Sequence, residues 1–362
     1  MENKASTYTR KPSSPNSISR RQFLDRTSKA ALGGLGAATL FERGAYGAVP
    51  TQAMLSTATP SATSTLPPNR FDYSPIIDRP VIKWPNNARV AFWVGPNIEW
   101  HEYTPQNHPT QPDIPSYAYY DAGNRVGFWR MLEVMDKHKI RGCVCLNDSM
   151  LYHCPEIRDA MVKRNWAYMA HGVYNSRPIT DYSIEQEREY WRDTIATVKQ
   201  YTGKQIKGRL GRGSGNTPNT PDLMAEFGLT YHCDWMFDDQ PFPMKVNNGA
   251  KFIHVPYSFQ LHDLQQSGWG KDAKHLAQAI KDQFDVYYAE GAESGKVMCV
   301  ALHPYLIGKA HRAKYLDEAF SYVLSHDGVW NTTADEIADY YIANYYDKVV
   351  AYVEQQKQKG LA

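Results

Sequence analysis

The chain has 362 residues, with 40 basic and 38 acidic side chains and a formal net charge of +2. Residues 1–47 hold eight Lys or Arg against three acids, so the remainder carries 32 basic and 35 acidic residues, a net charge of about −3. The positive charge therefore belongs to the N-terminal segment, and the pattern excludes a nucleic-acid-binding footprint. No segment after residue 47 is long and apolar enough to predict a membrane span.

Five cysteines lie at positions 143, 145, 154, 233 and 299, an odd number with no Cys-x-x-Cys spacing. This pattern disfavours a disulfide framework and a thiolate zinc site. Cys143 and Cys145 lie two apart in an apolar run, which points both to the same side of a strand. We expect buried, unreactive thiols.

The N-terminal segment Ser19-Arg20-Arg21-Gln22-Phe23-Leu24, followed by a soft apolar run from Ala30 to Phe41, resembles a twin-arginine export signal. An ordinary amphipathic helix is disfavoured because the run has no polar face. Small residues at Ala45 and Gly47 suit cleavage after Gly47, and an uncleaved N-terminal anchor is the alternative. The resemblance implies that the twin-arginine machinery exports the folded protein, to the periplasm or elsewhere outside the cytoplasm.

The sequence after the signal predicts one folded domain. Residues 48–84 are rich in Pro, Ser and Thr and predict an extended lead-in. Short apolar runs then alternate with longer amphipathic segments, which predicts a single α/β domain over residues 85–345, before a polar tail at 346–362. The short runs are Val90–Val94, Arg141–Leu146, Ala167–His171, Gly208–Gly211, Thr230–Trp235, Phe252–Pro256 and Val297–His303, and the helical segments are Gly127–His138, Glu185–Tyr201, Thr220–Phe227, Ala273–Tyr288, Lys314–Leu324 and Thr333–Tyr341.

Two architectures fit this alternation: a doubly wound open sheet and a deformed (β/α) barrel of about seven strands. No Gly-x-Gly-x-x-Gly follows the first strand, which disfavours a dinucleotide-binding open sheet. Because the carboxyl ends of barrel strands converge on one mouth, polar residues at strand ends favour the barrel. Those residues are Asn97, Glu99, Asn147, Asp148, His171, Arg212, Asp234 and His303.

Five motifs resemble those of the polysaccharide deacetylase superfamily and occur in its order. They are Asn97-Ile98-Glu99, His171-Gly172-Val173-Tyr174-Asn175, Gly211-Arg212-Gly213, Asp234-Trp235 with Asp238-Asp239, and Leu302-His303-Pro304. They are most similar to its allantoinase-like branch of cofactor-free ureide hydrolases, over residues 84–345. The resemblance implies a deformed barrel that hydrolyses a non-peptide carbon–nitrogen bond, in a small ureide or amide or in an N-acetylated sugar.

The resemblance also bears on a metal cofactor. In the deacetylases an Asp-Asp pair ends the first strand, and one Asp binds a divalent metal with two histidines spaced His-x-x-x-His. Here Glu99 stands at the position of the base, Trp100 replaces the second Asp, and Asn175 replaces the second histidine. We therefore expect no metal, and the alternative is a divalent ion such as zinc held by His171, Glu99 and His101.

Without a metal, the matched positions suggest acid/base catalysis. Glu99 is predicted to activate water as the general base, and His303 to protonate the departing nitrogen. Arg212 is predicted to orient an anionic substrate or Asp234. The expected substrate-binding residues are His171, Asn175, Asp234, Trp235 and Asp239, with the first two stabilising negative charge on the carbonyl oxygen.

Several structural alternatives stay open. Glu99 could pair with Arg125 or Arg130 in a structural salt bridge, and Arg212 could be an ordinary loop arginine. The segment Trp100–Tyr120 is expected to form a long loop over the barrel mouth, as a lid or a subunit contact. Its tyrosines could stack on a sugar or line a homo-oligomer interface.

Three function hypotheses follow. The first is a hydrolase of small ureides or amides, favoured by the incomplete metal pattern. The second is a metal-dependent deacetylase of extracytoplasmic polysaccharide, favoured by the export signal. The third is a non-catalytic carbohydrate-binding relative that keeps the barrel.

Overall fold

The structure is a computed structural model that describes residues 70–105, 109–267 and 272–359. The predicted export signal and most of the lead-in lie outside these residues. The described residues belong to one compact unit. No helix in the described ranges has the length and apolarity needed to cross a bilayer.

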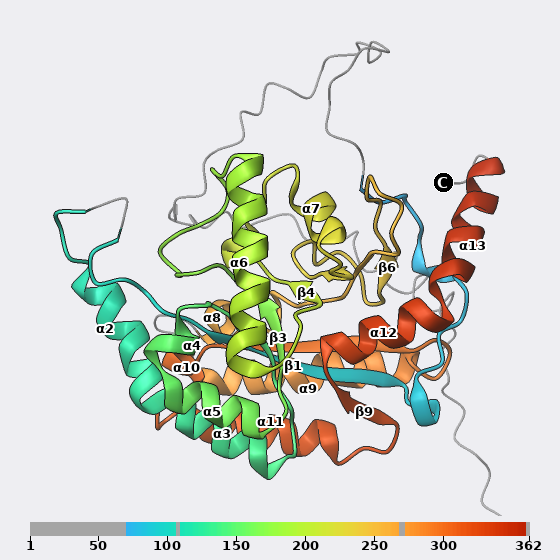
Figure 1. Cartoon of the computed structure of the whole chain (residues 1–362). Coiled ribbons are helices and arrows are strands. Elements are labelled where there is room, and N and C mark those ends of the chain that lie inside the picture. The colour runs from blue at the N-terminus through green and yellow to red at the C-terminus, as the bar shows by residue number, and fades with distance from the viewer. Residues whose placement is uncertain (1–69, 106–108, 268–271, 360–362) are drawn as a thin grey trace, which may run out of the picture. The chain divides into compact units, whose positions relative to one another are not determined.

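The strands and helices follow the predicted alternation (Figure 1). The strands are β1 Val90–Ile98, β2 Cys143–Leu146, β3 Ala167–Ala170, β4 Gly208–Arg209, β5 Tyr231–His232, β6 Phe242–Pro243, β7 Ile253–His254, β8 Lys296–Leu302 and β9 Val329–Thr332. The helices are α2 Ile114–Ala122, α3 Phe128–Lys137, α4 Met150–His153, α5 Pro155–Lys163, α6 Ile184–Thr202, α7 Thr220–Glu226, α8 Asp263–Ser267, α9 Ala273–Glu290, α10 Pro304–Ile307, α11 Ala313–Leu324, α12 Ala334–Asn344 and α13 Tyr346–Gln358.

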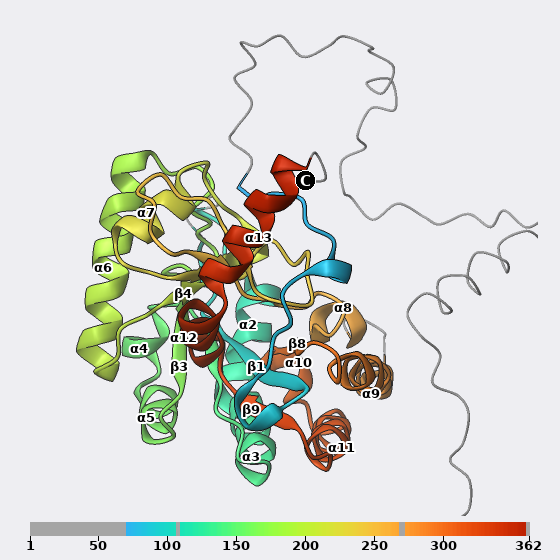
Figure 2. The ribbon, with the colours of Figure 1, turned by 90° about the vertical axis from the view of Figure 1, so that its right-hand side faces the viewer.

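One mixed sheet organises the domain. Its strand order is β6-β7-β5-β4-β3-β2-β1-β8, and β9 pairs with the first half of β1. Every pairing is parallel except that between β6 and β7, so seven parallel strands run from β7 to β8. The sheet curves into a half-barrel with helices around it (Figure 2). This arrangement confirms the predicted deformed (β/α) barrel of about seven strands.

Both faces of the sheet are buried, as expected for parallel strands that are covered by helices. Val90, Phe92 and Val94 belong to the core between the strands and the helices, whereas Ala91 and Trp93 belong to the core inside the half-barrel. Strand β2 alternates in the same way, with Cys143 and Cys145 inside the half-barrel. All five cysteines have free thiols. The period-2 alternation thus fixes which side chains at the strand ends face the barrel mouth.

Two segments differ from the predictions. The expected loop Trp100–Tyr120 ends in a helix, because α2 begins at Ile114 after Asp113 accepts a hydrogen bond from the Ser116 backbone N–H. None of the residues in α2 is buried, so the segment lacks an amphipathic signal. The expected polar tail after residue 345 contains α13, which buries Val349 and Val353 four residues apart. Two valines one helical turn apart give a narrow apolar stripe in an otherwise polar sequence.

Candidate active site

Glu99 and His171 meet at the carboxyl ends of β1 and β3. Each follows the last residues of its strand, and both side chains are buried, with exposed fractions of 5% and 4%. Glu99 Oε1 lies 3.1 Å from His171 Nε2, and His171 Nδ1 lies 2.6 Å from the Leu210 carbonyl oxygen. A carbonyl only accepts, so Nδ1 carries a proton and donates it to Leu210.

The charge on Glu99 is fixed by its neighbours. Burial alone would raise the pKa of the Glu99 carboxyl, but the hydrogen bond with His171 and the positive charges of His303 and His171 outweigh burial and hold this pKa below its ordinary value. Because the carboxylate is ionised, the hydrogen-bond network assigns a proton to His171 Nε2 as well. Glu99 Oε2 is buried without a hydrogen-bond partner among the described residues, and is therefore the oxygen available to a water molecule.

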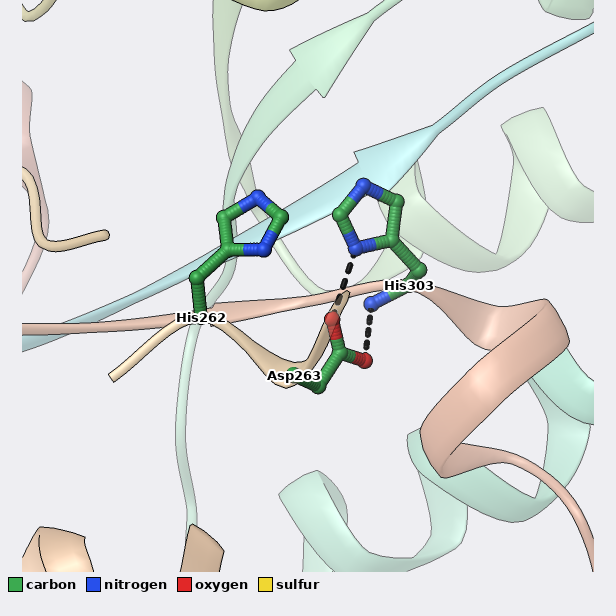
Figure 3. Close-up of side chains that lie close together, drawn as sticks. All are labelled: His262, Asp263 and His303. Carbon is green, nitrogen blue, oxygen red and sulfur yellow. Dashed lines mark hydrogen bonds and ion pairs between the residues drawn. The ribbon is translucent and has the colours of Figure 1, made fainter. Parts of the chain in front are cut away.

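His303 faces Glu99 from the end of β8. Its Nε2 lies 3.9 Å from Glu99 Oε2, and its Nδ1 lies 2.7 Å from Asp263 Oδ1. Asp263 Oδ2 also accepts the His303 backbone N–H at 2.6 Å, so the carboxylate holds both the ring and the main chain of His303 (Figure 3). Burial lowers the pKa of His303, but the charges of Asp263 and Glu99 outweigh it and raise this pKa overall. The Asp263 contact fixes the Nδ1 proton, which leaves Nε2 to exchange a proton in the pocket.

Tyrosine side chains form the wall beside these groups. The Asn175 side-chain amide donates to the Tyr120 hydroxyl at 2.8 Å, and the Tyr120 and Tyr305 rings lie 4.5 Å apart. The Tyr305 ring lies 5.0 Å from the His303 ring. Burial raises the pKa of both tyrosines, so their hydroxyls stay neutral hydrogen-bond donors.

Two buried asparagines brace the strand ends. The Asn147 side chain accepts the Trp100 backbone N–H at 3.0 Å and donates to the His171 carbonyl at 2.9 Å. Asn97 donates to the Leu302 carbonyl at 3.3 Å and to the Tyr257 hydroxyl at 3.2 Å. These bonds tie the backbone next to Glu99, His171 and His303 together, which limits the freedom of the three side chains.

The structure corrects the predicted partner of Asp234. Arg209, and not Arg212, forms a buried ion pair with Asp234, 2.5 Å apart. Gly211 permits this arrangement, because a Cβ there would lie 2.2 Å from a guanidinium nitrogen of Arg209. Asp234 also accepts the Gly211 backbone N–H at 2.7 Å, so it orders this loop. Arg212 is exposed, and its positive charge lowers the pKa of Tyr120 against the larger effect of burial, which raises it.

Other predicted residues take different places. Asp239 lies at the opposite end of β8 from His303, because its carbonyl accepts the Val297 backbone N–H and its carboxylate lies 3.7 Å from the Lys296 amine. This position does not fit the substrate-binding role predicted for Asp239. The Trp235 ring packs 4.8 Å from His232 and 5.6 Å from Phe71.

The predicted roles of His171 and Asn175 also change in detail. Both ring nitrogens of His171 have protein partners, so in this structure it supports Glu99 rather than a substrate carbonyl. Asn175 Oδ1 is buried and has no hydrogen-bond partner within the described ranges. The salt-bridge alternatives for Glu99 do not form, since Arg125 pairs with Asp121 and Arg130 donates to the Gly308 carbonyl.

The predicted metal ligands do not form a three-ligand group. His101 Nε2 lies 3.2 Å from Asp113 Oδ2, and its ring stacks on Tyr120. Within the described residues, one trio brings a ligand atom from each member within 4.8 Å of the others, and it consists of His262, Asp263 and His303. It shares only His303 with the motifs. The residues at the matched positions therefore do not fit a three-ligand hydrolytic zinc ion.

Three residues of the site were missed from the sequence. Asp263 begins the short helix α8, in a segment that no predicted element covers. Tyr305 lies two residues beyond His303, and Tyr120 ends the segment that was expected to be a loop. The adjacent pair His262-Asp263 in an apolar context was the one local signal that could have found Asp263.

Comparisons with known proteins agree with this fold. Residues 108–232 match the family model described as polysaccharide deacetylase. A protein of Schizosaccharomyces pombe named "Putative polysaccharide deacetylase" is 26% identical over 301 residues, which cover 72% of this chain and 93% of that protein.

Solved structures share the fold. The PuuE allantoinase is 27% identical, with a TM-score of 0.67 over 75% of this chain and 96% of the other. A "probable polysaccharide deacetylase" of Pseudomonas aeruginosa is 26% identical, with a TM-score of 0.65 over 74% and 95% of the two chains. These findings confirm the resemblance seen in the motifs: residues 108–232 match the polysaccharide deacetylase model, and the structural neighbours include an allantoinase as well as a probable polysaccharide deacetylase.

Proposed function

We propose that this polysaccharide deacetylase-like protein hydrolyses a non-peptide carbon–nitrogen bond of a small ureide or amide, with Glu99 as general base and His303 as general acid. One observation carries the proposal. Oε2 of an ionised, buried carboxylate makes no hydrogen bond within the described residues and lies 3.9 Å from Nε2 of a histidine whose Nδ1 is held by Asp263. A base and an acid in one desolvated pocket are what amide hydrolysis requires.

The proposed reaction uses each group once. Glu99 Oε2 removes a proton from water as the water oxygen bonds to the carbonyl carbon. His303 Nε2 then gives its proton to the departing nitrogen as the carbon–nitrogen bond breaks, and Asp263 stabilises the protonated ring before this step. The Glu99 proton then passes through solvent to His303 Nε2, which restores both groups to their starting state. His171 keeps Glu99 ionised by donating to Oε1.

The surroundings favour a small substrate. Glu99 and His303 are almost fully buried, and the rings of Tyr120 and Tyr305 pack beside them. Buried catalytic groups of this kind suit a compact ligand, whereas a polymer needs an open groove. Arg212 is exposed at the turn beside this wall and would bind a negatively charged group of the substrate.

The second candidate is a metal-dependent deacetylase of an N-acetylated extracytoplasmic polysaccharide. The family match of residues 108–232 and the names of two relatives favour it. The 27% identity to an allantoinase and the poor fit of the matched residues to zinc favour the first candidate. A carbohydrate-binding relative without catalysis remains the third.

Hydrolysis of allantoin and of N-acetylglucosamine oligomers, each with and without a chelator, separates the three. We expect chelator-resistant turnover of allantoin or another small ureide, lost in Glu99→Gln. Glu102→Gln is the matched control, because Glu102 pairs with Arg177 and Ser176 in the same loop but has no contact with His303. Deacetylation that requires a metal would favour the second candidate, and oligosaccharide binding without turnover of any substrate would favour the third.

We also propose that the protein works outside the cytoplasm after twin-arginine export, on the strength of the segment Ser19–Leu24. Replacing Arg20 and Arg21 together by Lys is expected to retain the protein in the cytoplasm. Equal amounts of variant and wild type in the exported fraction would refute this.

A further inference from the structure

His262 lies beside the proposed acid but has no place in the proposed reaction. The residue is buried, with an exposed fraction of 6%, and its ring centroid lies 4.7 Å from that of His303. Its Nδ1 atom has no hydrogen-bond partner in the part of the chain that the structure describes. Figure 3 shows the His262 and His303 rings side by side above the Asp263 carboxylate.

The unpartnered ring nitrogen of His262 is able to bind a ligand. Most buried polar side-chain atoms in proteins are hydrogen-bonded, and leaving one unpaired is destabilising. Water is one way to satisfy Nδ1. However, the neighbouring groups are a second imidazole and a carboxylate, and ligand atoms of all three residues lie within 4.8 Å of one another.

The three donors select a class of ligand. Two imidazole nitrogens and one carboxylate oxygen suit zinc, copper and nickel ions, whereas magnesium and calcium prefer oxygen alone. The single negative charge of Asp263 offsets part of the charge of a divalent ion in this buried position. Three protein ligands leave at least one coordination position for water.

We propose that His262, Asp263 and His303 form an inhibitory site for a divalent transition-metal ion such as zinc. Metal binding requires only these three residues. The inhibition rests on the proposed function, because a bound ion blocks catalysis only if His303 is the general acid. An ion bound to His303 Nε2 would occupy the atom that donates a proton to the departing nitrogen of the substrate. An ion bound to His303 Nδ1 would replace the proton that Nδ1 donates to Asp263. The proton left on Nε2 would then belong to a neutral imidazole ring, which is a poor acid.

The test titrates tag-free, chelator-treated protein with Zn²⁺ by calorimetry, and with Co²⁺ by its visible spectrum. We expect one ion per chain, with Co²⁺ bands of a site with nitrogen and oxygen ligands. His262→Asn should weaken binding by about tenfold or more, as expected for the loss of a ligand. His275→Asn, on the exposed surface of α9, is the control for adventitious binding by surface histidines.

Activity supplies a second readout. Zn²⁺ should inhibit the wild type at the concentrations that saturate the calorimetric site, and His262→Asn should keep metal-free activity of the same order while resisting inhibition. Because a folding defect could mimic lost binding, His262→Gln and thermal unfolding of each variant accompany the titration. Absence of stoichiometric binding, or equal affinity in His262→Asn, would overturn the site. Binding without inhibition in an active enzyme would overturn its inhibitory role, and binding in a protein with no turnover would contradict the proposed function alone.

Discussion

Asp263→Asn tests the proposed acid most directly, because the structure dictates how the new amide must sit. In the wild type, Asp263 accepts from the His303 backbone N–H at 2.6 Å and faces His303 Nδ1 at 2.7 Å. The backbone N–H can only donate, so the Asn oxygen must face it. The Asn NH₂ group then points at Nδ1, which can no longer carry a proton. The substitution therefore moves the ring proton to Nε2 and disfavours the doubly protonated ring.

The size of the effect follows from the role of His303. General acid catalysis contributes about 10²–10⁴-fold to a rate, or about 3–5 kcal/mol of barrier, and Asp263→Asn should forfeit most of it. The charge of Asp263 raises the pKa of His303 against burial, which lowers it. Removing that charge lets burial dominate, so the pKa of His303 falls.

The assay is a pH–rate profile of kcat/KM on the best ureide substrate. The acid must be protonated, so activity falls as pH rises through the pKa of His303, and in Asp263→Asn this alkaline limb should move to lower pH. Asp335→Asn is the matched control, since Asp335 accepts from the Tyr231 hydroxyl at 2.7 Å away from the site. An unchanged alkaline limb with a near-normal rate in Asp263→Asn would refute the acid role of His303.

Three further predictions test other parts of the structure. Arg212→Gln should raise KM for an anionic substrate by about 10- to 100-fold with little change in kcat, because a hydrogen bond to a charged group is lost. An equal rise in KM for a neutral substrate would contradict the anion-binding role of Arg212. Burial raises the pKa of Asp148 from 3.8 to about 7, so the native state loses stability between these values as pH rises; Asp148→Asn should raise the free energy of unfolding at pH 8, by at most about 4 kcal/mol, but not at pH 4. Urea unfolding of wild type and variant at the two pH values measures this difference in the free energy of unfolding. An equal increase at both pH values would contradict a cost from the buried charge of Asp148. Val349→Ala should lower the free energy of unfolding by about 1–3 kcal/mol and leave kcat unchanged, because α13 lies outside the site; unaltered denaturation would show that α13 contributes little to folding.

The sequence by itself determined the order of elements and the barrel, because each signal is local. Short, nearly continuous apolar runs within Val90–Val94 and Arg141–Leu146 mark strands whose two faces are both buried. The positions of Glu99, His171 and His303 at strand ends were readable for the same reason. Parallel strands bring their carboxyl ends together, so residues far apart in the chain were expected at one mouth, and these three do meet there.

Only the tertiary structure decided which neighbours each group has. Arg209 and Arg212 lie three residues apart, and nothing local shows that the first reaches Asp234, because a buried ion pair depends on how the loop folds across Gly211. Asp239 was expected to bind the substrate, and its sequence motif could not show that its turn lies at the opposite end of β8 from His303. Asp263 comes from a short helix 40 residues before His303, and only the packing of that helix against β8 makes it the partner of the histidine. The periodicity of apolar residues along a chain indicates which side chains are buried. A catalytic contact joins residues from separate segments, and the packing of the whole barrel sets the distance between them.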